Sequence, residues 1–278
     1  MLNISKKHNI RRYWLPGIVF LLAVLIAACG SASQSVDPQP ADSQQSSSQA
    51  TSIPQTAPDK VESAQDSITI VMPAEPGSIN PWDANCNATL DTAVCNEIVN
   101  EPFTWITSDT FEVVTLSGIE KWEQIDASTW EFTLRQGVKF HNGEPWNAEA
   151  AKVAIDQNGD EANSSQSYSY HGAITGRVVD EFTVAVDCAS ECPVLPRSMI
   201  FSRMQAPAWY ASASEEDRGR NIYGIGPYKL IEWRPGIDIK MEAYEDYVPN
   251  PDTSIVDGQA PNIKNLTNVW RGEQLVRA

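Results

Sequence analysis

Histidine and cationic residues are scarce in this sequence of 278 residues. It has three histidines, and 20 Lys plus Arg stand against 36 Asp plus Glu, which gives a formal net charge of −16. Nucleic-acid binding needs clustered Lys and Arg against phosphates, so this charge balance disfavours a nucleic-acid partner. Beyond the N-terminal segment only His141 and His171 remain, which are too few for a histidine-based metal site by themselves.

Signatures of catalysis are also missing. The sequence contains no GxSxG, HExxH or GxxxxGK[ST] motif. Gly224-Ile225-Gly226 has Lys229 where a dinucleotide-binding fingerprint would have its third glycine, so that motif fails. We therefore predict no catalytic residue, no metal and no cofactor. At 42% hydrophobic residues with nine Trp, the chain nevertheless has the composition for a sizeable core.

The longest purely apolar run, Ile18 to Ala28, is too short for a confident membrane span. It follows Lys6, Lys7, Arg11 and Arg12, and this pattern predicts a secretory signal peptide over residues 1–28. LIAACG (25–30) resembles a bacterial lipobox, which predicts cleavage before Cys29, acylation of its sulfur and an extracytoplasmic, membrane-anchored protein. An ordinary signal peptide with an incidental Cys29, or an uncleaved anchor, are the alternatives.

After Cys29 the composition is that of a tether. Residues 31–67 are rich in Ser, Gln, Ala and Pro and contain no aromatic residue, so they cannot bury enough apolar surface to offset chain entropy. We predict a disordered Ser/Gln/Pro-rich tether over residues 29–67. Its root-mean-square reach would be about 30 to 40 Å by the scaling for flexible linkers.

Four further cysteines allow three disulfide pairings, between which the sequence alone cannot choose. Because export favours oxidation, we favour the two local pairs, Cys86 with Cys95 and Cys188 with Cys192. A zinc site of four thiolates is the competing interpretation, although the spacings lack the paired CxxC knuckles of such sites.

The folded part, residues 68–278, mixes strands and helices without strict alternation, which predicts a mixed α/β fold. Apolar runs and alternation predict strands at 68–72, 130–134, 182–186, 228–233 and 237–243, the last two forming a hairpin. A helix is expected at 89–100, and a second should begin after Asn147, which can act as its N-cap. A short third helix should begin after Ser214, which can form a capping box with Asp217. A further helix starting at Trp270 would stop without a cap at Ala278, so we expect a fragment of a longer protein.

Three stretches taken together carry a resemblance. WEFTLRQGVKFHNGEP (130–145), VDEFTV (179–184) and GIGPYKLIEW (224–233) resemble, in order and spacing, the family 5 extracellular solute-binding proteins of ABC importers, which include oligopeptide, dipeptide and nickel binders. VDEFTV looks like the strand that follows the first stretch. GSINP (77–81) is similar to the loop after their first strand, with Asn80 in place of the usual Asp.

The resemblance implies a periplasmic-binding-protein fold of type II. Residues 68–278 would supply lobe I, with an inserted subdomain at about 104–187, and the second lobe would be missing. It also implies binding without catalysis: a peptide or similar small solute is captured and handed to a membrane permease, by a protein that we expect to be a monomer. An extracellular hydrolase on an α/β scaffold and a non-catalytic structural lipoprotein remain alternatives.

The loop from Trp82 to Ala88 is the candidate ligand-facing segment under this resemblance. Its candidate ligand-binding residues are Trp82, Asn85 and Asn87, and the two asparagines carry both hydrogen-bond donors and acceptors. A surface loop held by a disulfide is the alternative interpretation of the same residues.

Overall fold

The computed structural model describes residues 66–83, 99–253 and 258–271. Within those residues no helix combines the length and the apolar character needed to cross a membrane. The signal peptide expected at 1–28 lies outside the described residues, and so does the tether expected at 29–67 except for Asp66 and Ser67. Ser67 is the first residue of a strand, so the expected tether extends one residue too far.

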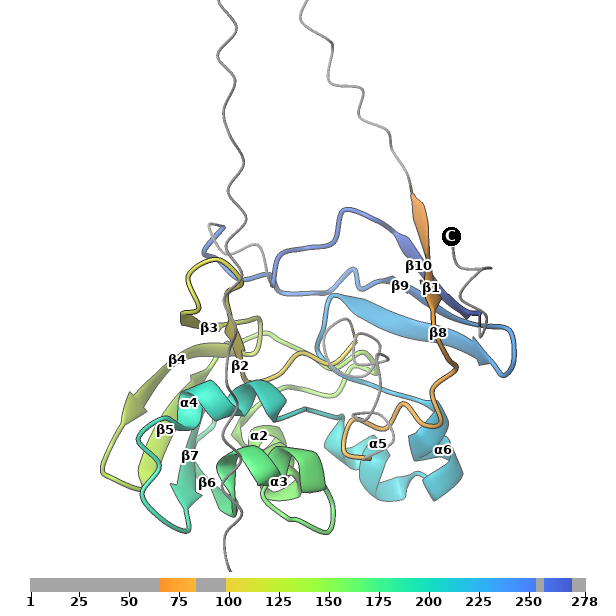
Figure 1. Ribbon diagram of the computed structural model, residues 1–278. Coiled ribbons are helices and arrows are strands. Elements are labelled where there is room, and N and C mark those ends of the chain that lie inside the picture. The colour runs from red at the N-terminus through yellow and green to blue at the C-terminus, as the bar shows by residue number, and fades with distance from the viewer. Residues whose placement is uncertain (1–65, 84–98, 254–257, 272–278) are drawn as a thin grey trace, which may run out of the picture. The chain divides into compact units, whose positions relative to one another are not determined.

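One four-stranded sheet joins segments far apart in the sequence (Figure 1). Its order is β1 (Ser67–Met72), β10 (Asn265–Trp270), β9 (Asp238–Ala243) and β8 (Tyr228–Arg234). β1 and β10 run parallel, whereas the other neighbours are antiparallel. We call this the distal sheet, because its first two strands are separated by almost the whole folded chain.

The expected hairpin forms β8 and β9, and Gly236 takes a positive φ of 75° in the turn. Ile239 and Met241 are buried, as the alternating pattern predicted. The expectation for Trp270 is wrong: it ends strand β10 instead of starting a helix, because its segment pairs with β1 and β9. Residues 272–278 lie outside the described part.

The second four-stranded sheet is built from neighbouring segments and is antiparallel throughout. Its order is β4 (Ile119–Gln124), β5 (Thr129–Leu134), β7 (Thr183–Cys188) and β6 (Ile174–Asp180). We call it the local sheet. The strand expected at 130–134 is confirmed as β5. The strand expected at 182–186 is confirmed as β7. Val179 and Asp180, which the resemblance joined to this strand, end β6 instead, and Asp180 accepts a hydrogen bond from Phe182 N at 2.8 Å in the turn into β7.

Helix α2 (Ala148–Asn158) covers one face of the local sheet, against β6 and β7. It begins as predicted: the Asn147 side chain accepts a hydrogen bond from Ala150 N at 3.0 Å. Helix and strand approach closely at Gly176, where a Cβ would lie 2.8 Å from Lys152 Cα. Helix α3 (Ser165–His171) follows α2 along the chain.

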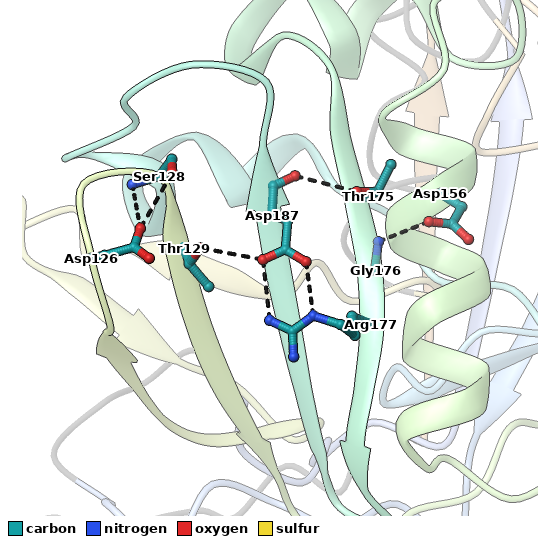
Figure 2. A network of polar contacts seen from close by, with 8 residues as sticks. All are labelled: Asp126, Ser128, Thr129, Asp156, Thr175, Gly176, Arg177 and Asp187. Atoms are coloured by element: carbon teal, nitrogen blue, oxygen red, sulfur yellow. Dashed lines mark hydrogen bonds and ion pairs between the residues drawn. The ribbon is translucent and has the colours of Figure 1, made fainter.

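The opposite face of the local sheet is polar (Figure 2). Asp187 on β7 lies between Thr129 on β5 and Arg177 on β6, and it accepts hydrogen bonds from Thr129 Oγ1 at 3.2 Å and from Arg177 Nε at 3.0 Å. On the helix side, Asp156 accepts a hydrogen bond from Gly176 N at 2.8 Å. Because successive side chains of a strand point to opposite faces, one face of the local sheet packs against α2 and the other carries these polar side chains.

The remaining elements are short. β2 (Thr104–Ile106) and β3 (Val113–Thr115) form a two-stranded sheet, and α4 (Leu195–Ser198) leads into the 3₁₀ turn η2 (Met199–Phe201). α5 (Pro207–Ser212) and α6 (Glu215–Arg220) follow, and Ser214 caps α6 by accepting from Asp217 N. Of the helix expected at 89–100, only the last two residues, Val99 and Asn100, are described, and these are not helical.

Two hydrophobic clusters accompany the two sheets. The larger contains Phe132 and Trp146 and gathers around the local sheet, while the smaller contains Ile239 and Met241 on the distal sheet. The chain passes between the sheets in two segments, which form an antiparallel bridge at Pro102 and Arg203. The range expected for an inserted subdomain, about 104–187, contains the two-stranded sheet and nearly all of the local sheet.

Candidate functional site

The stretch after β1 is fixed by local hydrogen bonds and by α6. Ile79 N donates to Gly219 O at 2.9 Å. Asn80 Oδ1 accepts from Trp82 N at 3.2 Å, and Asp83 N donates to Asn80 O at 3.0 Å. Such Asx-type turns are typical of Asn before Pro, since a short amide side chain replaces a backbone acceptor. Figure 1 shows this stretch, in orange, running from β1 to the neighbourhood of α5 and α6.

Trp82, expected to face a ligand, has a largely buried side chain that is 2% exposed. Its Nε1 donates to Arg203 O at 3.2 Å, and its ring meets Tyr210 of α5 edge to face, with centroids 4.6 Å apart. Trp82 is therefore held rigidly, and it contributes to a cavity wall while it also anchors the loop to the core.

Helices α5 and α6 supply an aromatic ring and a cation beside this loop. The Arg218 guanidinium carbon lies 4.3 Å from the centroid of the Tyr210 ring. Asn80 Nδ2 donates to Tyr210 Oη at 3.3 Å, which ties the loop to the same ring. Arg218 Nε is buried and has no hydrogen-bond partner within the part of the chain that the structure describes.

These residues line a cavity of about 570 Å³. Its walls come from the loop after β1, from the connection between α2 and α3, and from α5 and α6. The lining residues are Asn80, Trp82, Asp83, Glu161, Ala162, Asn163, Tyr210, Glu215, Arg218 and Gly219. The volume falls within the usual range of small-molecule sites, roughly 300 to 1,000 Å³.

The lining suits reversible recognition of a polar solute. Two aromatic rings offer flat apolar walls, Asn80 and Asn163 offer amides, and the charged side chains have both signs. Sequence reasoning singled out Trp82 here but missed Tyr210 and Arg218. The sequence signal near these two residues was the capping box of α6, which predicts where that helix begins but does not indicate ligand binding.

Most of the other residues named from the sequence lie outside the described part of the chain. This holds for Cys29, Asn85, Cys86, Asn87 and Cys95.

Cys188 and Cys192 form a disulfide, with Cα atoms 6.4 Å apart, at the end of β7. Among residues 66–83, 99–253 and 258–271, no group of three or more His, Cys, Asp or Glu side chains could hold a metal ion.

Two buried titratable groups lie away from the cavity lining. Glu101 accepts from Ser117 N at 3.0 Å and also from the hydroxyls of Ser117 and Tyr247. Burial raises its pKa, and these hydrogen bonds oppose the rise. Burial lowers the pKa of His141 to about 4, although its ring hydrogen bond with Gly226 O raises it. Glu101 connects Ser117, near the local sheet, to Tyr247, near the distal sheet. His141 likewise connects its turn to Gly226, just before β8, so we assign both groups a structural role.

Comparison with known families identifies the group to which this arrangement belongs. The model for "Bacterial extracellular solute-binding proteins, family 5 Middle" matches residues 114–269, more than half of the chain. The chain belongs to this family. The resemblance seen in the sequence is thereby confirmed, and the family consists of extracellular substrate-binding proteins.

Family 5 relatives with curated names include glutathione-binding proteins. Glutathione-binding protein GsiB of Salmonella typhi is 28% identical over 177 residues, which cover 61% of this chain and 33% of that protein. GsiB of Escherichia coli K12 is 29% identical over 129 residues, covering 44% and 24%. The chain thus spans about a third or less of the length of these relatives.

Solved structures of substrate-binding proteins share the fold. MoaA of A. tumefacien R10, in complex with mannopinic acid, gives a TM-score of 0.64 at 18% identity, covering 77% of this chain and 42% of MoaA. OppA of Burkholderia pseudomallei gives 0.59 at 19% identity, covering 76% and 43%. The expected mixed α/β fold of the periplasmic-binding-protein type is therefore confirmed.

Proposed function

We propose that this chain is part of the extracytoplasmic solute-binding component of an ABC importer, which captures a peptide or similar small solute and delivers it to a membrane permease. The observation that carries the proposal is the family 5 match over residues 114–269. The cavity beside Trp82 and Tyr210 supports it, because its volume and mixed lining suit a small polar solute.

The activity in this proposal is binding without chemical change. The charged and amide groups of the cavity can hydrogen-bond a solute, and the aromatic walls can pack against it. Since the chain spans about a third of the length of its glutathione-binding relatives, we propose that residues 68–278 form one lobe of the receptor, with an inserted subdomain at about 104–187. Closure of a second lobe would be favoured by solute contacts made to both lobes.

We further propose that the receptor acts as a monomer held to the membrane by lipid on Cys29. Residues 29–67 would form the tether, and the pair Cys86–Cys95 would close the loop that carries Asn85 and Asn87. Intact-mass measurement of the mature protein, with and without reductant, tests both points. An unmodified Cys29 would contradict the anchor, and a reactive thiol at Cys86 without reductant would contradict the pairing.

Tryptophan fluorescence of the complete gene product, titrated with peptides including glutathione and with free amino acids, tests the proposed binding. We expect a saturable change with at least one solute and recovery of that solute unchanged by chromatography. Consumption of the solute would favour the hydrolase alternative. The absence of saturable binding to any solute would favour a structural lipoprotein.

A further inference from the structure

The charged groups that line the cavity beside Trp82 are unequal in sign. Asp83, Glu161 and Glu215 contribute carboxylates, and Arg218 contributes the one cation among the lining residues. With all four ionised, the lining carries a formal charge of −2. A solute with a net positive charge reduces this negative charge, whereas an anionic solute increases it.

Arg218 lies among these carboxylates without pairing with one of them. Among the described residues no carboxylate oxygen lies within 4.0 Å of its guanidinium, which instead rests on the Tyr210 ring. Stacking on an aromatic face leaves the edge of a guanidinium free to take a carboxylate through two parallel hydrogen bonds. A carboxylate on the solute would thus find its partner at Arg218.

Glu161 and Glu215 reach the cavity from different elements. Glu161 belongs to the connection between α2 and α3, and Glu215 to the first turn of α6. Neither forms an ion pair or a side-chain hydrogen bond within residues 66–83, 99–253 and 258–271. They are therefore available to ammonium or guanidinium groups of a solute, at positions separate from Arg218.

We propose that this cavity selects solutes that carry one carboxylate and more than one cationic group, as basic amino acids do. Arg218 binds the carboxylate, Glu161 and Glu215 bind the cationic groups, and the rings of Trp82 and Tyr210 flank the aliphatic part. The proposal rests on the solute-binding function proposed above and adds the charge class of the solute.

Calorimetric titration of the complete gene product with three solutes tests the charge preference. L-Lysine has the carboxylate and two cations, L-norleucine lacks the side-chain cation, and cadaverine lacks the carboxylate. We expect lysine to bind about tenfold or more tightly than either of the others, since each loses one charge-assisted contact. Equal affinity for lysine and norleucine would overturn the proposal.

Substitutions separate the roles of the two signs. Arg218→Gln should weaken lysine binding about tenfold or more and leave cadaverine binding unchanged, because only lysine has a carboxylate. Glu161→Gln and Glu215→Gln should weaken the binding of both. Glu120→Gln, on β4 and outside the cavity lining, removes the same charge and should alter neither.

The outcomes also distinguish this proposal from the broader one. If the gene product binds neutral or acidic solutes saturably and Arg218→Gln has no effect, the charge preference is wrong while solute binding stands. If no solute of any charge binds, the solute-binding function itself fails.

Discussion

The two four-stranded sheets differ in how their strands come together. The local sheet pairs segments that are close in sequence, and its packed face rests on a large cluster with α2. The distal sheet pairs β1 with β10, about 200 residues away, over a smaller cluster of buried residues. Pairing β1 with β10 closes a long loop, which costs chain entropy, and the smaller cluster offsets that cost with less buried apolar surface. We therefore expect the local sheet to be the more stable region.

A core truncation in each sheet tests this difference with the largest expected effect. Phe132→Ala, at a position 0% exposed in the local sheet, should lower the free energy of unfolding by about 3 to 5 kcal/mol. Met241→Ala in the distal sheet should cost less, about 2 to 3 kcal/mol, because its cluster is smaller. Urea titrations of both variants measure the difference.

If Phe132→Ala does not fold, Ile155→Val on α2 gives a milder test, with an expected loss of about 0.5 to 1.5 kcal/mol. A larger loss from Met241→Ala than from Phe132→Ala would reverse the ranking of the two sheets.

Acid should weaken the junction between the two regions through His141. Its turn contacts Gly224 and Gly226 just before β8, and burial lowers its folded pKa from 6.5 to about 4. A depressed pKa means that the folded state favours the neutral ring. This stability is fully present above pH 6.5 and is lost as pH falls to about 4, by up to about 3 kcal/mol.

Urea titrations at pH 7 and pH 4.5 measure this loss, and His141→Gln serves as the non-titrating comparison. Glu101, whose pKa is raised, acts in the opposite direction in both proteins, so the difference between them isolates His141. An equal acid effect on the natural protein and on the variant would contradict the account.

Asn268 offers a way to strengthen the distal sheet. It lies in the middle of β10, is 2% exposed, and its amide nitrogen and oxygen have no hydrogen-bond partner within the described residues. Replacing it with leucine removes two unsatisfied polar atoms at similar size, which should raise the free energy of unfolding by about 1 to 2 kcal/mol. Thermal unfolding measures the gain, and Asn265→Leu, at an exposed position on the same strand, serves as the control. A loss of stability for Asn268→Leu would show that its amide is hydrogen-bonded.

Helix caps give the smallest effects. Asn147 caps α2, which packs on the local sheet, and Ser214 caps α6, which buries none of its residues. Asn147→Ala should lower stability by about 1 kcal/mol, and Ser214→Ala should lower it by less, because fraying of α6 exposes little apolar surface. Amide exchange of both variants localises each loss; global destabilisation by Ser214→Ala alone would be unexpected.

The sequence predicted the elements whose signals are local. The alternation at Trp130, Phe132 and Leu134 reports burial on one face, and the Asn147 cap marks a helix start directly. β10 was missed because NLTNVW has weak alternation and becomes a strand only by pairing with β1 and β9. The alternation of Phe182, Val184 and Val186 predicted β7 correctly, whereas the turn at Asp180 that separates β7 from β6 was not predicted.

The candidate site was harder to foresee than the fold. Trp82 was identified through the position of its loop, but Tyr210 and Arg218 come from short helices whose sequence resembles ordinary surface. They meet Trp82 only because Ile79 binds Gly219 and Trp82 binds Arg203, two contacts that join segments more than 100 residues apart. Tertiary contacts of this kind leave no periodic signal in a single sequence.

Native mass spectrometry of the complete gene product tests the central claim most directly. The protein is measured before and after exposure to a panel of peptides and amino acids of different charge. We predict a complex of one protein with one solute, which dissociates on dilution and releases the solute at its original mass. A solute released with a changed mass, or the absence of any complex across the panel, would contradict the assignment of this chain to a solute receptor.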